Sequence, residues 1–233
     1  EIKPEVLITS AYGKKVSETL LDIFSLGNIN IHPSLLPRWR GPSPIESAII
    51  EGDKETGVTL IQMTEELDAG PIYTQKSIPL GEENTKRLSE KLSLLAANML
   101  EDFLPSFLEG AQEAKKQDER LVTYSKTIKK EHARVDWNEN AKTIDKKIKA
   151  YYPWPAAHTY LENKYFRIWD SKALANNEEE GSPGEIVDIN KEGVVVKCNG
   201  GKIILKGIQP EGKKEMLATD FARGNKLEGK SFS

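Results

Sequence analysis

The stretch Asn28-Ile29-Asn30-Ile31-His32-Pro33-Ser34-Leu35-Leu36-Pro37 decides the fold of the first half of the chain. Side chains along a β-strand alternate between two faces, so Asn30 and His32 share one face while the isoleucines pack on the other. Pro33 has no backbone N–H for the strand ladder and disfavours helix at His32, so we expect the strand to end there. Because ligands bind at the carboxyl ends of strands in open α/β sheets, this amide and imidazole are candidates for a binding site.

The residues before this strand predict a βαβ unit. Val6-Leu7-Ile8 is an apolar run too short for a helix, and it indicates a buried parallel strand. Residues 17–24 show a helical pattern, with Ser17 as the N-cap and Gly27 as a stop signal. A strand, a short helix and the strand that carries His32 imply parallel pairing with a right-handed crossover.

Further elements are expected up to residue 108. The apolar residues from Leu88 to Phe107 recur at helical spacing, which indicates a long amphipathic helix, bent or ended near Pro105. The expected elements are a helix at 45–50, strands at 57–63 and 72–78, a turn at 68–70 and the long helix at 85–108. Residues 1–112 are therefore predicted to form an α/β domain.

The pattern changes in the second half. Residues 113–120 are polar or charged apart from Ala114, which indicates a connecting segment, here given as 113–125. Several short strands and one basic helix then predict a small twisted barrel over residues 126–233. The elements are a helix at 141–151, strands at 164–169, 184–187, 193–197 and 202–206, and a hairpin turn at Asn199-Gly200-Gly201.

Composition excludes several classes of protein. The 233 residues, of which 38% are hydrophobic, are enough for two domains with their own cores. The net charge of −3 gives no strong overall attraction to nucleic acid or membranes, so such a contact needs a local patch. The single cysteine, Cys198, cannot form an internal disulfide, which favours a reducing compartment. No apolar run approaches the roughly 20 residues that a membrane helix needs.

Asn30, His32 and Asp68 form the candidate catalytic set, and Asp68 lies in Leu67-Asp68-Ala69-Gly70. If Asp68 lies beside His32, its charge favours the imidazolium and raises the proton affinity of the ring. An imidazolium and an amide that are aimed at one developing oxyanion suit acyl transfer through a tetrahedral intermediate. The alternative is that Asn30 caps a loop and that His32 is a core histidine with satisfied hydrogen bonds.

Other reaction types fit the sequence less well. His132 and His158 lack cysteine or carboxylate partners at ligand spacing, so we expect no metal site. The sequence contains no glycine-rich phosphate loop of a common type. Ser34 lacks the flanking glycines of a nucleophile elbow, so capping of the loop is its expected role.

Two groups of basic residues are candidates for contact with RNA. Arg38 and Arg40 flank Trp39 and could bind a phosphate or stack on a base, and the alternative is a solvated turn. Four lysines of the expected basic helix could follow a nucleic-acid backbone, although such a run of charge is more often only a wet surface. These are Lys142, Lys146, Lys147 and Lys149.

Taken with its other motifs, the chain resembles the methionyl-tRNA formyltransferases. The AYG motif at 11–13 and the LDAG motif at 67–70 are shared in outline with other folate-dependent formyltransferases. The resemblance runs from Pro4 to Phe232. It is carried further by NIHPSLLPRWRG at 30–41, GDKETGVT at 52–59, VDW at 135–137, IKAYYPWP at 148–155 and QPEGKKEM at 209–216.

The resemblance implies transfer of a formyl group from 10-formyltetrahydrofolate to the α-amino group of initiator methionyl-tRNA, for translation initiation. In that reaction Asn30 and His32 hold the formyl oxygen, while Asp68 orients His32 and helps a proton to leave the amine. The resemblance implies a pterin pocket at Tyr12, Gly13, Lys14, Val16, Ser34, Leu35, Leu36, Pro37, Glu66 and Leu67. Contacts with tRNA are expected at Arg38, Arg40, Lys142, Lys146, Lys147 and Lys149.

The resemblance also implies the architecture. We expect a Rossmann-like formyltransferase domain, incomplete at its N-terminus, followed by a small OB-like barrel that binds tRNA. Relatives begin with another half-domain, which carries a loop near the folate and an inserted loop that reaches the tRNA acceptor end. The sequence also departs from the family at 40–44, where RGPSP replaces the usual RGAAP. The family implies a monomer in the bacterial cytoplasm or an organellar matrix, without membrane contact.

Two alternatives remain open from the sequence. A sugar-nucleotide N-formyltransferase shares the catalytic set and has a similar second domain, although the motifs at 148–155 and 209–216 favour the tRNA enzyme. A catalytically inert tRNA-binding fragment is an alternative from another class. It predicts salt-sensitive tRNA binding that survives loss of His32.

Overall fold

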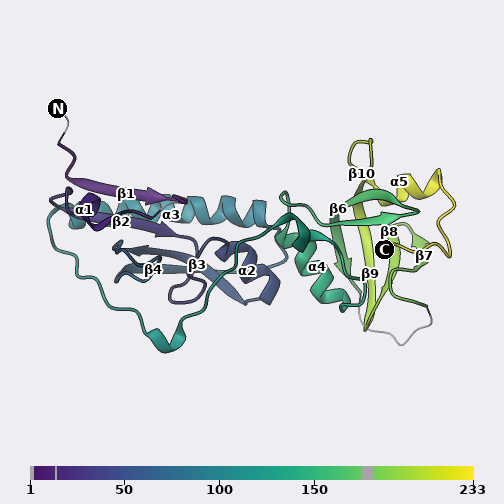
Figure 1. The fold of residues 1–233 in the computed structure, drawn as a ribbon, viewed down its shortest axis with the longest axis horizontal. Helices are drawn as coiled ribbons and strands as arrows, with labels where there is room; N and C mark the ends of the chain where they lie inside the picture. The colour runs from purple at the N-terminus through teal and green to yellow at the C-terminus, as the bar shows by residue number, and fades with distance from the viewer. Residues whose placement is uncertain (1–2, 14, 175–180) are drawn as a thin grey trace. The chain divides into compact units, whose positions relative to one another are not determined.

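The chain forms two compact units (Figure 1). Its structure is a computed structural model that describes residues 3–13, 15–174 and 181–233. The first unit comprises Glu1–Ala48, Gly52–Glu82 and Arg87–Thr127, and the second comprises Ile49–Glu51, Glu83–Lys86 and Ile128–Ser233.

The first unit contains a four-stranded sheet with the order β1-β2-β3-β4. β1 (Val6–Ser10) and β2 (Gly27–His32) are parallel, with the short helix α1 (Glu18–Leu21) between them in the chain. β3 (Glu55–Ile61) and β4 (Ile72–Pro79) continue the sheet in antiparallel pairing. The parallel βαβ unit is confirmed, whereas the expectation of a parallel sheet is wrong beyond β2, because β3 runs against it.

Two details at the start of this unit differ from the expectation. β1 is not a buried strand, since Ile8 is 40% exposed. The physical reason is its position at the end of the described strand order, where one side has no neighbouring strand. Ser17 lies at the N-cap of α1 in extended conformation, but its side chain makes no capping hydrogen bond, so that part of the prediction is wrong.

Two further helices begin in regions that the sequence indicates. α2 (Pro44–Glu51) and α3 (Thr85–Leu108) both agree with the expected ranges, and α3 continues past Pro105 to Leu108. Phe103 and Phe107 of α3 pack against Tyr73 of β4, with ring centroids 5.3 and 5.4 Å from that of Tyr73. Among the described residues no helix combines the length and the apolar character that a membrane crossing requires.

The segment expected to connect the domains lies in the first unit up to Thr127. It contains one turn of 3₁₀ helix, η1 (Glu119–Leu121). Lys115 forms an isolated β-bridge with Ile72, and Tyr124 forms another with Arg40. The segment is therefore held against the first unit by backbone pairing, although its composition is that of a solvated linker.

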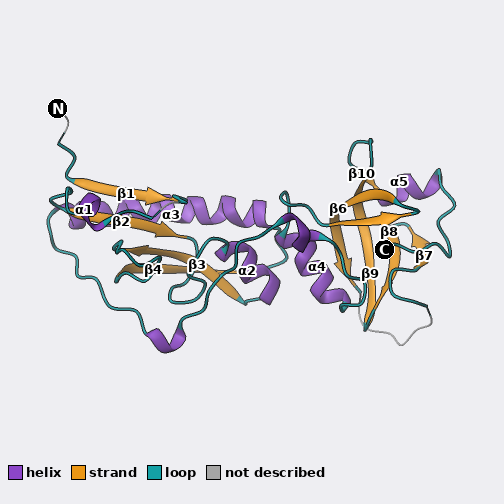
Figure 2. Ribbon diagram, in the orientation of Figure 1, coloured by secondary structure: helices purple, strands orange, loops and turns teal. Residues whose placement is uncertain are grey.

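The second unit is dominated by antiparallel strands (Figure 2). The order of its sheet is β5-β6-β9-β8-β7, with β10 paired to β9, and α4 packs against β6 and β9. The elements are η2 (Lys130–Ala133), α4 (Ala141–Ala150), β5 (His158–Leu161), β6 (Lys164–Ala173), β7 (Ile186–Asn190), β8 (Gly193–Cys198), β9 (Gly201–Pro210), β10 (Met216–Leu217) and α5 (Ala218–Arg223). The sequence missed β5, β10 and α5, which are short.

The described strands do not form a closed barrel, since their order is an open path from β5 to β7. The end of the chain lies beside both of these strands. Ser233 exchanges backbone hydrogen bonds with Tyr160 of β5, and Phe232 donates its N–H to the carbonyl of Gly184, just before β7. Phe232 also stacks on Trp137 in the core of this unit. The C-terminal residues therefore join the two ends of the sheet through isolated bridges.

Candidate active site

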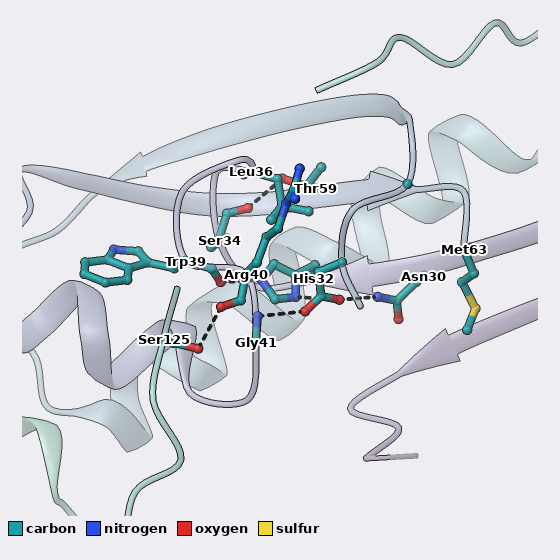
Figure 3. A network of polar contacts seen from close by, with 12 residues as sticks. Asn30, His32, Ser34, Leu36, Trp39, Arg40, Gly41, Thr59, Met63 and Ser125 are labelled. Carbon is teal, nitrogen blue, oxygen red and sulfur yellow. Dashed lines mark hydrogen bonds and ion pairs between the residues drawn. The ribbon is translucent and has the colours of Figure 1, made fainter. Parts of the chain in front are cut away.

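Two members of the candidate catalytic set, Asn30 and His32, lie at the carboxyl end of β2 (Figure 3). The Nδ1 atom of His32 lies 3.5 Å from Oδ1 of Asp68, and the Asn30 amide donates to the same oxygen at 3.4 Å. The second carboxylate oxygen of Asp68 accepts a hydrogen bond from the Gly41 N–H at 2.9 Å. The structure thus brings together the amide, imidazole and carboxylate that the sequence suggested, from positions 38 residues apart at most.

Thr9 fixes the orientation of the Asn30 amide. The Thr9 hydroxyl donates to Oδ1 of Asn30 at 2.8 Å, and the two residues are partners in the β1–β2 register. Because a carboxylate only accepts hydrogen bonds, the NH₂ group of Asn30 must face Asp68. The amide therefore presents N–H donors toward the space beside the carboxylate, and sequence reasoning missed the threonine that holds it there.

The ring of His32 is held in one tautomer. Its Nε2 atom lies 2.9 Å from the carbonyl oxygen of Trp39, which can only accept, so Nε2 carries a proton. In the neutral ring, Nδ1 is then the unprotonated nitrogen, and it faces Asp68. The hydrogen bond between His32 and the Trp39 carbonyl was not predicted, because a sequence pattern does not show which backbone groups of a loop come close to a strand side chain.

Burial decides the charge of His32. Burial of the ring lowers the pKa of His32, and this effect exceeds the raising effects of the Asp68 carboxylate and of the hydrogen bond to Trp39. The expected effect of Asp68, which raises the proton affinity of the ring, is present, but burial outweighs it and holds the pKa of His32 below its ordinary value. His32 is therefore poised to gain a proton at Nδ1, where Asp68 would stabilise the charge that forms.

The loop that carries Asp68 has special backbone requirements. Asp68 has a φ of 53°, in the left-handed region that aspartate tolerates better than most residues. Gly70 approaches Gln62 so closely that an added Cβ would lie 1.7 Å from its carbonyl oxygen. Gly41, which donates to Asp68, has a φ of 108° that favours glycine. Both glycines of these loops are therefore needed for the approach of the carboxylate.

A pocket beside Asn30 and Asp68 contains four of the residues expected to bind the pterin. Tyr12, Val16, Glu66 and Leu67 line it, while Gly13 is not among its lining residues. Lys14, which the resemblance also implied, lies outside the described residues. The pocket has further lining residues that sequence reasoning missed, namely Thr9, Lys15, Ile61, Met63, Thr64, Glu65 and Gly70.

The other four expected pterin contacts do not line this pocket. Ser34 is buried and donates its hydroxyl to the Arg38 carbonyl at 2.6 Å, which agrees with the expected role in capping the loop. Leu36 is buried and donates its N–H to Thr59, while Leu35 lines a separate pocket with Arg38 and Trp39. Ser34 and Leu36 are buried and Leu35 and Pro37 are half-buried, and these four residues build the loop that follows β2.

The two arginines of the same loop have different environments. Arg38 forms two hydrogen bonds with the Asp53 carboxylate, at 2.8 and 2.6 Å, and its guanidinium lies 4.3 Å from the Trp39 ring centroid. Arg40 is only 1% exposed, and its guanidinium binds Glu119 at 2.7 Å. The expectation that Arg40 contacts tRNA is wrong, because its side chain is enclosed by protein.

The lysines of α4 mostly have partners within the second unit. Lys147 binds Glu139 at 2.6 Å, Lys149 binds Asp145 at 2.7 Å, and Lys146 donates to the Glu51 carbonyl at 3.1 Å. Lys142 is exposed. The helix therefore has no continuous basic stripe along these four lysines, because three of their ammonium groups make internal contacts.

The described part of the chain places no cluster of metal-ligating side chains beside the site. Within residues 3–13, 15–174 and 181–233, no group of three or more histidine, cysteine, aspartate or glutamate side chains is arranged to hold a metal ion. The polar groups of the site are instead hydrogen-bonded to one another. Such an arrangement suits proton transfer and stabilisation of a developing oxyanion.

Comparison with known protein families defines the class of this chain. The family model described as "Formyl transferase" matches residues 1–103, and the one described as "Formyl transferase, C-terminal domain" matches residues 127–226. The chain therefore contains the N-terminal and C-terminal domains of a formyltransferase, each with its own sheet.

Individual relatives narrow this class. Methionyl-tRNA formyltransferase of Lysinibacillus sphaericus (strain C3-41) is 40% identical over 225 residues, which cover 96% of this chain and 72% of that protein. The enzyme of the same name from Staphylococcus aureus (strain Newman) is 36% identical over 100% of this chain and 76% of its own length. The chain belongs to the methionyl-tRNA formyltransferase family. It is an enzyme that formylates methionyl-tRNA, as the sequence predicted.

Solved structures share the fold at lower identity. HypX from Aquifex aeolicus, solved in complex with tetrahydrofolic acid, has a TM-score of 0.72 and 21% identity over 99% of this chain and 43% of its own. WlaRD, a sugar 3N-formyl transferase, has a TM-score of 0.68 and 19% identity over 90% of this chain and 73% of its own. At these identities the likeness shows a common fold and nothing finer.

Proposed function

We propose that the enzyme takes its formyl group from 10-formyltetrahydrofolate and delivers it to the α-amino group of initiator methionyl-tRNA, with Asn30, His32 and Asp68 as its catalytic residues. The single observation that carries this proposal is the meeting of the three side chains. One carboxylate oxygen of Asp68 lies within 3.5 Å of both the His32 ring and the Asn30 amide. The family match supports the choice of substrates.

The reaction forms a bond between the methionine nitrogen and the formyl carbon, and it breaks the bond from that carbon to the folate nitrogen. As the amine attacks, the formyl oxygen gains negative charge, and the Asn30 amide donates a hydrogen bond to it. The amine must lose one proton, and the departing folate nitrogen must gain one. Asp68 is placed to accept the proton of the amine, directly or through water.

His32 has a role that follows from its tautomer. Nε2–H is engaged by the Trp39 carbonyl, so only Nδ1 can exchange protons with the reacting groups. The ring starts neutral because burial lowers the pKa of His32. Asp68 passes the proton that it takes from the amine to Nδ1 of His32, 3.5 Å away, and the protonated ring then donates a hydrogen bond to the oxyanion beside Asn30. Asp68, again a carboxylate, stabilises this imidazolium, which afterwards gives its proton to the leaving folate nitrogen.

The pocket beside Asn30 and Asp68 is our proposed site for the pterin ring. Tyr12, Val16 and Leu67 supply apolar surface, and Glu66 adds an acceptor for ring N–H groups. HypX, which shares this fold, was solved with tetrahydrofolic acid, and this supports a folate as the ligand of the pocket. In this arrangement the formyl group would lie next to the amide of Asn30.

Aromatic rings and an arginine on β5 and β6, together with Arg134 beside β5, form a surface that suits RNA better than the lysines of α4. Stacking on half-exposed aromatic rings and contact with arginine are the usual means of binding unpaired bases and the backbone. His158 stacks on Tyr165 at 5.1 Å, and the Arg134 guanidinium lies 5.6 Å from the Tyr160 ring. We name this the aromatic–arginine surface, and it consists of Arg134, His158, Tyr160, Tyr165, Arg167 and Trp169.

Replacing Arg134 and Arg167 by glutamine is expected to weaken the tRNA interaction. If each arginine neutralises one phosphate, the double variant should flatten the dependence of log K on log salt by about 2 and raise KM for tRNA. The measurement is tRNA binding over a range of salt concentrations, with Lys191→Gln, which removes an exposed charge elsewhere in this unit, as a control. A salt slope equal to that of the unchanged protein would remove the surface from the proposal.

The remaining parts of the proposal concern organisation. We propose a catalytic, Rossmann-like domain at 1–112, a connecting segment at 113–125, and a tRNA-binding domain of OB-like kind at 126–233, acting as a monomer in the cytoplasm. Burial raises the pKa of the Cys198 thiol to about 12, so this cysteine is an unreactive core residue. That fits a reducing compartment, where no disulfide is needed.

A substrate comparison tests the proposal. Charged initiator tRNA and a UDP-amino sugar are each offered to the enzyme with 10-formyltetrahydrofolate, and formation of formylated product is measured. We expect product with the tRNA alone. Transfer to the sugar instead would favour the alternative of a sugar-nucleotide N-formyltransferase. Tight tRNA binding without transfer to either acceptor would favour an inert RNA-binding fragment.

A further inference from the structure

Residues 115–125, here called the strap, pair with two loops of the candidate active site within the first unit. At one end, Lys115 and Ile72 exchange backbone hydrogen bonds of 2.8 Å. At the other end, the Arg40 N–H donates to the Thr123 carbonyl at 2.9 Å, and the Ser125 N–H donates to the Arg40 carbonyl at 2.8 Å. The strap therefore binds both the segment that follows Asp68 and the loop that contains Trp39 and Gly41.

Gln117 connects these two loops through its side chain. Its NH₂ group donates to the carbonyl of Asp68 at 2.7 Å and to the carbonyl of Gly70 at 2.8 Å. Its Oε1 accepts a hydrogen bond from Nε of Arg40 at 3.0 Å. Each polar atom of this amide is thus used, and both carbonyls lie in the loop that presents the catalytic carboxylate.

Arg40 in turn holds Gln117 in place. The Arg40 side chain is almost fully enclosed, and Glu119 of the strap binds its guanidinium at 2.7 and 3.3 Å. A buried guanidinium keeps its partners because leaving it unpaired is costly. The next residue, Gly41, donates its N–H to the carboxylate of Asp68. Asp68 is therefore held at two points. Gln117 binds its carbonyl, and Gly41, the residue after Arg40, binds its carboxylate.

The loop around Asp68 needs such support because nothing regular holds it. Asp68 lies outside the strands and has a left-handed backbone conformation, which costs energy outside glycine. Its carboxylate must nevertheless stay 3.5 Å from the His32 ring. Catalytic groups that are misplaced by about 1 Å can lose about 100-fold in rate.

We propose that Gln117 is a positioning residue for formyl transfer, which sets the Asp68 carboxylate against His32 by holding the Asp68 and Gly70 carbonyls. This rests on the catalytic role proposed for Asp68. The segment that composition marks as a linker is then a part of the active site. Polar side chains in it point at backbone groups of the site, and loss of their donors should be felt in catalysis.

The first test compares substitutions of Gln117 in the enzyme. Gln117→Ala is expected to lower kcat by about 10- to 100-fold, with little change in KM for tRNA, because the carboxylate is misplaced and not removed. Gln117→Glu keeps an acceptor for Arg40 but cannot donate to the two carbonyls, so it should be at least as impaired. Gln112→Ala is the matched control, because Gln112 is another half-buried glutamine of this unit that is bonded to Ser106. Recovery of kcat in Gln117→Glu would show that only the Arg40 contact matters, and would overturn the proposal.

The second test reads the position of Asp68 without any turnover. The chain has three histidines, so ring NMR signals of His32 can be followed through a pH titration. The Asp68 carboxylate raises the pKa of His32 against the effect of burial. If Asp68 moves away in Gln117→Ala, the pKa of His32 should fall further, in the same direction as in Asp68→Asn. An unchanged His32 titration, together with unchanged kcat, would overturn the positioning role. If the unsubstituted enzyme transfers no formyl group, that result counts against the proposed function. The His32 titration still tests whether Gln117 positions Asp68.

Discussion

Asp68→Asn is expected to lower kcat/KM for formyl transfer by about 100- to 10,000-fold, which is the usual contribution of a positioned acid or base. The substitution keeps size and shape, and the amide oxygen of asparagine can still accept the Gly41 N–H that now binds Oδ2. It cannot take a proton from the amine, and it has no charge to stabilise a protonated His32 ring. The fall should appear in kcat more than in KM, because the lost interaction belongs to the transition state.

The measurement is steady-state transfer to charged initiator tRNA, with thermal unfolding of the same preparations as a check on folding. Asp102→Asn provides a matched control, since Asp102 is an exposed carboxylate on α3. It should leave the rate and the unfolding temperature unchanged. A rate within about tenfold of the unsubstituted enzyme for Asp68→Asn would mean that the carboxylate moves no proton, and our mechanism would have to be abandoned.

The part of the site that lies on one strand could be predicted from local pattern. Strand alternation places Asn30 and His32 on the same face, and Pro33 marks the end of β2, which the structure ends at His32. The approach of Asp68 could not be obtained in that way. It depends on β3 pairing beside β2 and on a loop conformation at Asp68 and Gly70, so the pattern alone left it open and the family resemblance made it an expectation.

The environments of charged side chains were harder to predict from the sequence than those of apolar residues. Arg38 and Arg40 look alike in the sequence, yet one is half-exposed and the other is enclosed by Glu119, which lies 79 residues further on. On α4 some warning was available, because Asp145 lies four residues before Lys149 and such a pair commonly forms on a helix. In other cases, whether a lysine is solvent-exposed or paired depends on residues that are distant in the sequence and close only in the fold.

Composition predicted a solvated linker before the second unit, where the structure has a segment that is paired with the first unit. A run of polar and charged residues indicates a solvated linker, and the same residues suit a strap that binds backbone groups. Gln117 gives no sign in the sequence of its two carbonyl partners, which lie 49 and 47 residues before it. Polar residues near a domain boundary are therefore poor evidence of flexibility when nearby loops have backbone groups to satisfy.

Asn30→Ala is expected to lower kcat by about 100- to 1000-fold, the usual cost of losing one donor to a developing oxyanion. The amide is aimed by Thr9 and faces the carboxylate of Asp68, so the donor is fixed before substrate arrives. Asn30→Asp should be at least as damaging, since it keeps the shape, removes the donor and adds negative charge beside Asp68. KM for the folate should change little in Asn30→Ala if the amide contacts only the formyl oxygen.

Thr9→Val tests the orientation of the Asn30 amide separately from its ability to donate a hydrogen bond. Valine keeps the shape of the threonine but cannot donate to Oδ1 of Asn30, so the amide remains present but is free to turn. The rate should therefore fall by less than in Asn30→Ala, and adding Thr9→Val to Asn30→Ala should cost little more, because the hydroxyl then has no amide to orient. Single-turnover measurements on the two single variants and the double variant decide this. Full additivity of the two losses would mean that Thr9 acts elsewhere, for example through its contact with Met63, and that the amide is aimed by Asp68 alone.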